Sequence, residues 1–299
     1  MKIKIIHHNV RHWINPMNIN ENSNFYLSKD PDIITINSHS IRDTRKNVKL
    51  FNYSGYTKNK INQAGSGVAI LVKQNIQHIF HTNTINENIM AVTIDTTHGK
   101  LTIITFYRPP RQDTLPLTDI QNFLNYNHPT IILADANIKH PHFGHNNSNR
   151  LGTLLNNFNN TVDLHYIGPN FNTFFSHNMK GKPDIILVNT AFLTLAYNLE
   201  EGPRLTSSDH IPITLTASTS PIAIPTAPRY NYNRADWPKF TEHMKLLPLP
   251  NIINKPTEDI DKLWETLIKH IQDGANNYIP KTTFKKIPAL NDSRRTRNL

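Results

Sequence analysis

Acidic and amide side chains border apolar runs at two places in the chain. Residues 130–137 read TIILADAN, so Asp135 and Asn137 follow a strand-like run directly. Residues 207–215 read SSDHIPITL, so Asp209 and His210 come just before another such run. A carboxylate, an amide and an imidazole at strand ends can orient a water molecule, transfer a proton and bind a metal ion. Each motif alone is also typical of a polar turn, so order and spacing must decide between the two interpretations.

Three weaker signals lie elsewhere in the chain. Asn9 ends the first apolar run in HHNV, Gly65 and Gly67 precede VAILVK, and Tyr107 follows ITF in FYRPP. Taken singly, these patterns are typical of a turn cap, a glycine turn and a core aromatic with a bonded hydroxyl. A glycine pair without a following Gly-Lys-Ser/Thr is not a phosphate loop.

Short runs of β-branched residues bounded by turn residues predict strands, and predicted helices fall between only some of these strands. The predicted strands are Lys2–Ile6, Ile33–Ile36, Gly67–Val72, Ile89–Ile94, Leu101–Phe106, Thr130–Leu133, Asp184–Val188 and Ile211–Leu215. Helices are predicted over Thr118–Leu124, with Thr118 as the N-cap, and over Arg150–Phe158. This mixture indicates an α/β sandwich rather than a strictly alternating doubly wound sheet.

The composition changes near residue 218. Residues 219–228 are rich in Ser, Ala and Pro, which predicts a linker after a domain spanning 1–218. Residues 229–299 carry apolar side chains at helical spacing, among them Ile260, Leu263 and Leu267, and end in a tail that we expect to be disordered. The second region is therefore predicted to be a helical appendage.

Charge and cysteine usage narrow the classes of function. The 32 Lys and Arg residues exceed the 22 Asp and Glu residues, and the resulting charge of +10 favours a polyanionic partner. The chain has no cysteine, which excludes disulfides, thiolate zinc sites and cysteine nucleophiles. A zinc site built from His140, His142 and His145 alone is disfavoured. No apolar run approaches the length of about 18 residues that a membrane span needs, so no membrane partner is expected.

Seven motifs in order resemble the endonuclease/exonuclease/phosphatase superfamily, and most of all the apurinic-endonuclease-like domains of non-LTR (LINE-type) retrotransposons. The motifs are Asn9, GSGVAILV, FYRPP, ADAN, NTFFS, PDIILV and SSDHIPI, and they cover residues 1–216. Residues 229–285 resemble the segment that joins such a domain to reverse transcriptase. The resemblance implies a two-sheet α/β sandwich of the deoxyribonuclease type. It also implies a nuclear endonuclease that nicks one strand of double-stranded DNA to prime reverse transcription, with element RNA and a reverse transcriptase domain as partners.

The resemblance also implies a role for each matching residue. Asn9 and Asp209 would hold a divalent metal ion, and their oxygen and amide groups suit Mg²⁺ or Mn²⁺. Asp135 would activate the attacking water, and Asn137 would stabilise the transition state. His210 would contact the scissile phosphate. The matching supporting and phosphate-contacting residues are Asp184, which orients His210, together with Tyr107, Thr173 and Ser208.

One position departs from the family pattern. The run Pro31–Ile36 is followed by Asn37-Ser38-His39, so Ser38 stands where the family has a metal-binding glutamate. A neutral hydroxyl cannot replace a carboxylate at a hard cation, so we expect weaker metal binding and reduced activity with DNA binding retained. Rescue by His39 or Asp43, or a metal ion held only by Asn9, Asp209, water and substrate, are the alternatives.

Two other classes of function stay open at this point. One is a DNA-binding module without catalysis, and the other is a hydrolase acting on phospholipid head groups or inositol phosphates. The polar segments Asn52–Gln63 and Phe171–Lys182 are candidate DNA-contacting loops, with solvated turns as the alternative.

Overall fold

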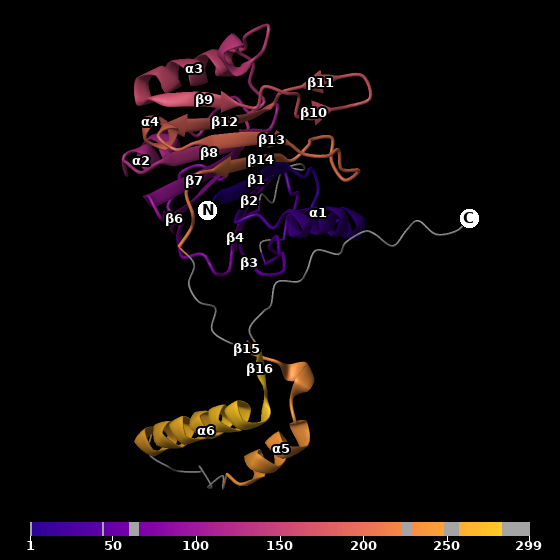
Figure 1. The fold of residues 1–299 in the computed structure, drawn as a ribbon, viewed down its shortest axis with the longest axis vertical. Helices are drawn as coiled ribbons and strands as arrows, with labels where there is room; N and C mark the ends of the chain where they lie inside the picture. The colour runs from indigo at the N-terminus through magenta and orange to yellow at the C-terminus, as the bar shows by residue number, and fades with distance from the viewer. Residues whose placement is uncertain (1, 44, 60–65, 223–228, 248–256, 283–299) are drawn as a thin grey trace, which may run out of the picture. The chain divides into compact units, whose positions relative to one another are not determined.

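The computed structural model describes residues 2–43, 45–59, 66–222, 229–247 and 257–282 (Figure 1). It divides into two compact units, Met1–Ile224 and Pro225–Leu299. Residues 219–222, predicted to begin the linker, pack on the first unit, where Ser220 O accepts a hydrogen bond from Thr97 N at 2.9 Å. Residues 223–228 and the tail from 283 lie outside the described residues.

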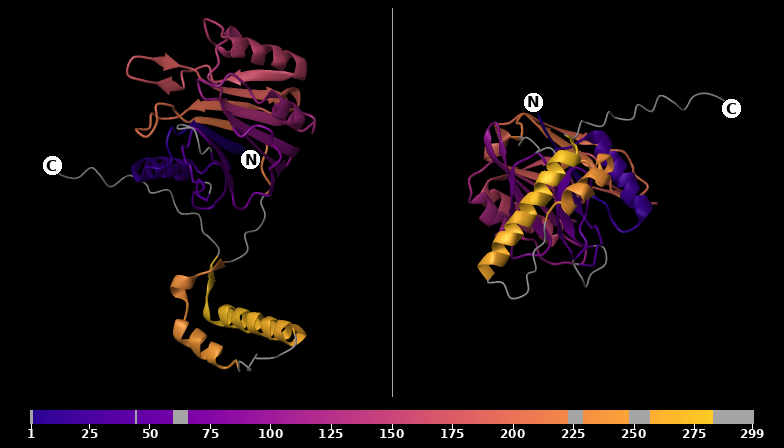
Figure 2. Two further views of the ribbon diagram at one scale, coloured as in Figure 1. Left: turned by 180° about the vertical axis from the view of Figure 1, so that it is seen from behind. Right: turned by 90° about the horizontal axis from the view of Figure 1, so that it is seen from below.

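Two six-stranded sheets face each other in the first unit (Figures 1 and 2). The first sheet has the order β13-β14-β1-β2-β4-β3. Its strands are β1 (Ile3–Asn9), β2 (Ile33–Asn37), β3 (Tyr53–Lys58), β4 (Val68–Lys73), β13 (Tyr197–Glu201) and β14 (Ile213–Ala217). β1 and β2 are parallel, with Asn9 opposite Asn37. The amide side chains that end both strands therefore meet at one edge of the sheet.

The second sheet has the order β5-β6-β7-β8-β12-β9. Its strands are β5 (His78–His81), β6 (Ile89–Thr96), β7 (Gly99–Tyr107), β8 (Thr130–Asp135), β12 (Asp184–Asn189) and β9 (Leu164–Gly168). β7 and β8 are parallel, with Tyr107 opposite Asp135, and β12 runs antiparallel to β8, with Asp184 opposite Asp135. The end of β7, the end of β8 and the start of β12 thus lie at one edge.

Successive side chains of a strand point to opposite faces of its sheet, so the apolar side chains form three clusters. On β1, Ile3 and Ile5 face the core between the sheets, whereas Ile6 faces outward. The outward face of the first sheet packs against Phe25 and Tyr26 of α1 (Pro16–Lys29). The outward face of the second sheet packs against α2 (Leu117–Leu124) and α3 (Arg150–Val162). Each fully buried aliphatic side chain contributes about 1.5–3 kcal/mol. The predicted two-sheet α/β sandwich is confirmed.

The eight predicted strands all correspond to observed strands, but four further long strands were not predicted. These four, β3, β5, β9 and β13, are the edge strands of the two sheets. Edge strands are half exposed, so their sequences lack the continuous apolar run of a strand buried on both faces. Helix α1 was not predicted either, because its sequence is mostly polar and buries only Asn22, Phe25 and Tyr26.

The prediction of Thr118 as an N-cap is wrong. The helix begins at Leu117, so Thr118 lies inside it, and Pro116 occupies the cap position without a side-chain hydrogen bond. A proline fits there because its backbone lacks the N–H that the first turn of a helix leaves unpaired.

In its described residues the second unit has two α-helices, α5 (Trp237–Lys245) and α6 (Thr257–Tyr278), the 3-10 helix η2 (Tyr232–Arg234), and the short pair β15 (Arg229–Tyr230) and β16 (Lys281–Thr282). The rings of His243 and His270 stack with centroids 4.0 Å apart. Nε2 of each ring bonds to the backbone carbonyl of the other residue, at 3.1 and 2.7 Å. The predicted helical C-terminal region is confirmed. No helix in the described part of the chain combines the length and apolarity needed to cross a membrane.

Candidate active site

The ends of strands from both sheets bring the predicted site residues together. Asn9 ends β1, Tyr107 ends β7, Asp135 ends β8, and Asp184 begins β12. His210 lies in the loop before β14 and forms a bridge with Phe174 of β10 (Phe174–Phe175). Residues separated by up to 201 positions in the chain thus surround one point between the sheets.

Asp135 is held by amide groups on both of its oxygens. Nδ2 of Asn9 donates to Oδ2 at 2.6 Å, and Nδ2 of Asn137 donates to Oδ1 at 2.7 Å. The backbone N–H of Asp135 donates to Oδ1 of Asn37 at 2.9 Å. Burial, and then the nearby charge of Asp184, raise the pKa of Asp135 well above its usual range. The carboxylate is therefore oriented and poised to accept a proton.

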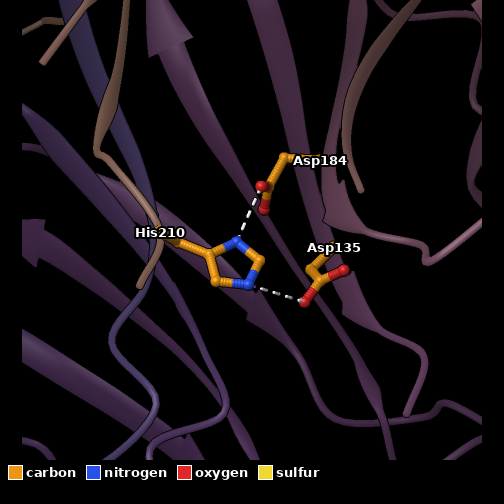
Figure 3. A group of neighbouring side chains, drawn as sticks. All are labelled: Asp135, Asp184 and His210. Carbon is orange, nitrogen blue, oxygen red and sulfur yellow. Dashed lines mark hydrogen bonds and ion pairs between the residues drawn. The ribbon is translucent and has the colours of Figure 1, made fainter. Parts of the chain in front are cut away.

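His210 lies between two carboxylates (Figure 3). Nδ1 of the ring bonds to Oδ2 of Asp184 at 2.8 Å, and Nε2 lies 3.8 Å from Oδ2 of Asp135. Burial by itself lowers the pKa of His210, but the charges and the hydrogen bond of the neighbouring carboxylates, Asp184 foremost, raise it to about 9. The ring is thus an imidazolium at neutral pH, with its Nε2 proton on the side of Asp135.

Asp184 is supported from behind by two further residues. The Thr173 hydroxyl donates to Oδ2 at 2.5 Å, and Nε2 of His7 lies 3.6 Å from Oδ1. Burial opposes ionisation of Asp184, yet the charge and hydrogen bond of His210, together with the nearby His7 ring, keep the pKa of Asp184 below its usual range. Thr173, predicted at a phosphate-contacting or supporting position, is fully buried here and bonds to Asp184.

His7 was not predicted as a site residue. Its Nδ1 bonds to the hydroxyl of Thr35 at 2.9 Å, and its ring faces the interior between the sheets. A signal was present in the sequence, because His7 lies two positions before Asn9 and side chains two apart on a strand share a face.

Asn137 and Arg108 hold the loop after β8. Arg108 is buried, and its guanidinium donates to the carbonyls of Ala136 at 2.7 Å and Asn137 at 2.6 Å. Asn137 has a left-handed backbone with φ of 49°, and its Nδ2 donates to Arg108 O at 3.0 Å as well as to Asp135. Asn137 therefore orients Asp135 in this structure, and the buried Arg108 is a positioning residue that sequence reasoning missed.

Ser208 and Tyr107 link the site to its surroundings. The Ser208 hydroxyl donates to Asn9 O at 2.6 Å and accepts from His210 N at 3.0 Å, so it joins β1 to the loop of His210. Burial and then the charge of Asp135 raise the pKa of Tyr107 to about 12, against a hydrogen bond with Ser38 that lowers it. Tyr107 is therefore a neutral hydroxyl beside Asp135.

The predicted metal ligands Asn9, Ser38 and Asp209 are only partly available to bind a cation. Oδ1 of Asn9 accepts the backbone N–H of Arg11 at 2.9 Å, and the carboxylate of Asp209 is paired with the Arg11 guanidinium. Ser38 is neutral and nearly buried. The set thus contains one carboxylate, which already has a cationic partner. Because hard divalent cations favour several unpaired oxygen ligands, these residues fit a tightly bound Mg²⁺ or Mn²⁺ poorly.

The two residues considered as rescuing ligands are engaged elsewhere. Nε2 of His39 bonds to Lys58 O at 3.1 Å, and its Nδ1 accepts from Ile41 N at 3.1 Å. Burial lowers the pKa of His39 to about 4. Asp43 is paired with Arg45 at the surface. Neither replaces the missing carboxylate in this arrangement.

Asp135, Asp184 and His210 form the one group of potential metal-binding side chains found among the described residues, with ligand atoms within 4.8 Å of one another. The His210 ring already bridges the two carboxylates. The histidines of residues 140–145 make local contacts instead: Nδ1 of His140 accepts from His142 N at 3.2 Å, and Nε2 of His145 bonds to Lys182 O at 3.2 Å.

The two candidate DNA-contacting segments differ in structure. Most of the described part of Asn52–Gln63 is edge strand β3 rather than a loop, and residues 60–63 lie outside the described residues. Residues 171–182 form a hairpin of β10 and β11 (Lys180–Gly181) that projects beyond the sheets (Figure 2). The Phe174 ring lies 5.3 Å from the His210 ring, and the Arg204 guanidinium lies 3.9 Å over the Phe175 ring. The hairpin is therefore anchored directly beside His210.

Two facing mixed sheets with an Asp–His pair and an amide-held aspartate at one edge resemble the endonuclease/exonuclease/phosphatase type of domain. A family model described as "Endonuclease-reverse transcriptase" matches residues 101–214, which include every predicted site residue except Asn9 and Ser38. In this region the chain is similar to the endonuclease part of retrotransposon proteins, and the relatives and structures below share that likeness.

Two curated proteins of Drosophila melanogaster are similar in sequence. The probable RNA-directed DNA polymerase from transposon X-element is 29% identical over 239 residues, covering 76% of this chain and 26% of the relative. The RNA-directed DNA polymerase from mobile element jockey is 24% identical over 221 residues, covering 72% of this chain and 24% of the relative. The chain thus spans about a quarter of the length of these relatives.

Solved structures share the fold at low sequence identity. The endonuclease domain of TRAS1, a telomere-specific non-LTR retrotransposon, superposes with a TM-score of 0.62 at 17% identity, covering 73% of this chain and 98% of that one. The catalytic domain of APE2 from Xenopus laevis gives a TM-score of 0.58 at 17% identity, covering 75% and 94%. The AP endonuclease of Leishmania major gives 0.58 at 12% identity, covering 72% and 87%.

Proposed function

We propose that this domain binds double-stranded DNA in the nucleus and hydrolyses one phosphodiester bond in one strand, leaving a 3′ hydroxyl that primes reverse transcription. The proposal rests on the arrangement around Asp135. Its two carboxylate oxygens accept hydrogen bonds from the amides of Asn9 and Asn137. Oδ2 of Asp135 lies 3.8 Å from Nε2 of His210, and Asp184 orients the His210 ring. Element RNA and a reverse transcriptase domain are the proposed partners.

The chain's own residues supply two parts of the reaction. Ionised Asp135 accepts a proton from the attacking water, while Asn9 and Asn137 hold the carboxylate in one orientation. The His210 imidazolium places a positive charge and the Nε2 proton where the phosphate would carry negative charge in the transition state. Asp184 keeps the proton of Nδ1 in place, so that Nε2 always faces the substrate side.

A divalent cation is expected to bind weakly. Mg²⁺ or Mn²⁺ would add positive charge near the phosphate, but Ser38 supplies no carboxylate and Asp209 is paired with Arg11. We therefore propose an endonuclease weakened by Ser38. The neutral Ser38 and the Asp209–Arg11 pair also favour the second candidate, a DNA-binding module without catalysis.

A plasmid-nicking assay separates the two candidates. Native protein and the Ser38→Glu, Asp135→Asn and His210→Ala variants are incubated with supercoiled plasmid in Mg²⁺ or Mn²⁺, and duplex binding is measured over a range of salt concentrations. An endonuclease shows slow native nicking that Ser38→Glu accelerates and that the other two variants lose.

A binding module shows affinity that falls linearly with the logarithm of salt concentration, and no cleavage by any variant. Rapid native nicking that the glutamate does not improve would contradict the proposed weakening by Ser38.

A further inference from the structure

Arg11 contacts two of the three predicted metal ligands, Asn9 and Asp209. Its backbone N–H donates to Oδ1 of Asn9 at 2.9 Å, and its carbonyl accepts from the Ser40 hydroxyl at 2.9 Å. Its φ of 57° is in the left-handed region, which an L residue with a long side chain rarely adopts. The surrounding hydrogen bonds hold this turn, and the turn directs the side chain toward Asp209.

The guanidinium remains accessible in that position. Nη1 of Arg11 is bonded to Oδ2 of Asp209, while 58% of the Arg11 side chain is exposed, against 18% for Asp209. In the described part of the chain, Asp209 is the one group to which this guanidinium bonds. Arginine has five N–H donors in a planar fork that matches two phosphate oxygens, so donors remain for a ligand.

Two of the three carboxylates at the site already have a cationic partner. Asp184 is paired with His210, and Asp209 is paired with Arg11. Asp135 is neutralised in part by amide donors and by His210 at 3.8 Å. A divalent cation would have to displace the guanidinium from Asp209, and Ser38 offers no second carboxylate to compensate.

We propose that Arg11 is a catalytic residue whose guanidinium, held by Asp209, contacts the scissile phosphate in the place of a divalent metal ion. The inference rests on the proposed function for its substrate, a DNA phosphodiester. The guanidinium donates two hydrogen bonds to the non-bridging phosphate oxygens and stabilises their charge in the transition state. Nicking by this chain accordingly does not depend on Mg²⁺ or Mn²⁺.

The first measurement is Mn²⁺ binding in the absence of DNA, monitored through the electron paramagnetic resonance signal of free Mn²⁺. The proteins are native chain, Arg11→Gln, Arg11→Lys and the control Arg45→Gln, which removes an exposed arginine that is also paired with an aspartate. Arg11→Gln frees Asp209 and should tighten Mn²⁺ binding by about tenfold. Arg45→Gln should bind Mn²⁺ as weakly as the native chain. Equal Mn²⁺ affinity of the native and Arg11→Gln proteins overturns the proposal.

The second measurement is plasmid nicking in EDTA. Native protein and Arg45→Gln should nick, Arg11→Gln should be slower by about 100-fold, and Arg11→Lys should fall between them because it keeps the charge without the fork. A native enzyme that nicks only with Mn²⁺ overturns the proposal.

The two proposals fail in different ways. If no variant nicks DNA under any condition, the proposed function fails. The Mn²⁺ titration still decides whether Arg11 occupies the cation's place, because tighter binding by Arg11→Gln supports that placement and unchanged binding refutes it. Thermal denaturation of each variant establishes that an altered affinity does not come from unfolding.

Discussion

Oδ2 of Asp184 accepts two hydrogen bonds, from Nδ1 of His210 at 2.8 Å and from the Thr173 hydroxyl at 2.5 Å. The pairing sets the orientation of the ring. Because Nδ1 must carry a proton to donate to a carboxylate, Nε2 is directed toward Asp135 and the substrate side. The carboxylate also stabilises the positive charge of the ring.

Replacing Asp184 with asparagine should lower the nicking rate by about 10²- to 10⁴-fold, because an amide neither balances the charge of the imidazolium nor holds the ring in its orientation. DNA affinity should change little, since Asp184 is buried behind the ring. Single-turnover nicking and duplex binding measure the two effects. Asp163→Asn is a matched control, because Asp163 forms an exposed pair with His165. Native-like nicking by Asp184→Asn would refute the role given to this pair.

Nicking should have a bell-shaped dependence on pH. The rate should increase as Asp135 loses its proton, at a pH well above the usual carboxyl range, because burial and Asp184 raise its pKa. The rate should decrease near pH 9, where His210 loses its proton and charge. Single-turnover rates between pH 5 and 10 measure both limbs. A rate already at its maximum at pH 5 would show that Asp135 is not the base.

Acid should destabilise the fold through His8. The Tyr26 hydroxyl bonds to Nδ1 of His8 at 2.9 Å, and Nε2 bonds to His210 O at 3.2 Å, so the buried ring is neutral. Burial lowers its pKa from 6.5 to about 3. Since the unfolded chain binds the proton more readily, the stability present above pH 6.5 is lost as the pH falls toward 3, at about 1.4 kcal/mol per pH unit.

Urea denaturation at pH 7.5 and 5 measures this loss. Between these values His8 alone should lower the free energy of unfolding by about 2 kcal/mol. His8→Gln should show a smaller dependence on pH, though not none, because His39 also has a lowered pKa. The exposed His177→Gln is the control and should behave as the native chain does. An identical pH dependence in His8→Gln and native protein would contradict the prediction.

Gly67 should not tolerate a side chain. Its φ is 100°, and a Cβ built on it would lie 2.4 Å from Cε1 and Nε2 of the His39 ring. Its carbonyl also accepts from Ser38 N at 2.8 Å, so a shift there moves the site loop. We expect Gly67→Ala to reduce the free energy of unfolding by about 2–4 kcal/mol, from backbone strain and the clash together.

Gly99→Ala is the control for backbone strain without a clash, because Gly99 has a φ of 96° but an added Cβ would meet nothing within 4 Å. That control should cost about 1 kcal/mol through backbone strain alone. Chemical denaturation of both variants gives the difference. Equal losses for the two alanines would show that the His39 ring moves aside freely.

The buried strands and the residues at their ends could be predicted from local sequence patterns. Asn9, Asp135 and His210 could be identified because apolar runs bounded by polar residues are local patterns, and the order of the motifs resembled a known family. The departure at Ser38 was also visible without a structure. The edge strands and α1 were not predictable in this way, because partly exposed elements carry no strong apolar period.

The pairing of these residues depends on the three-dimensional arrangement of the chain. Arg11 and Asp209 are 198 positions apart, and His7 reaches Asp184 from the opposite sheet. Thr173 likewise turned out to support Asp184 from a buried position. Such contacts depend on strand order, register and the facing of two sheets. These are set by the sum of long-range packing rather than by any local pattern.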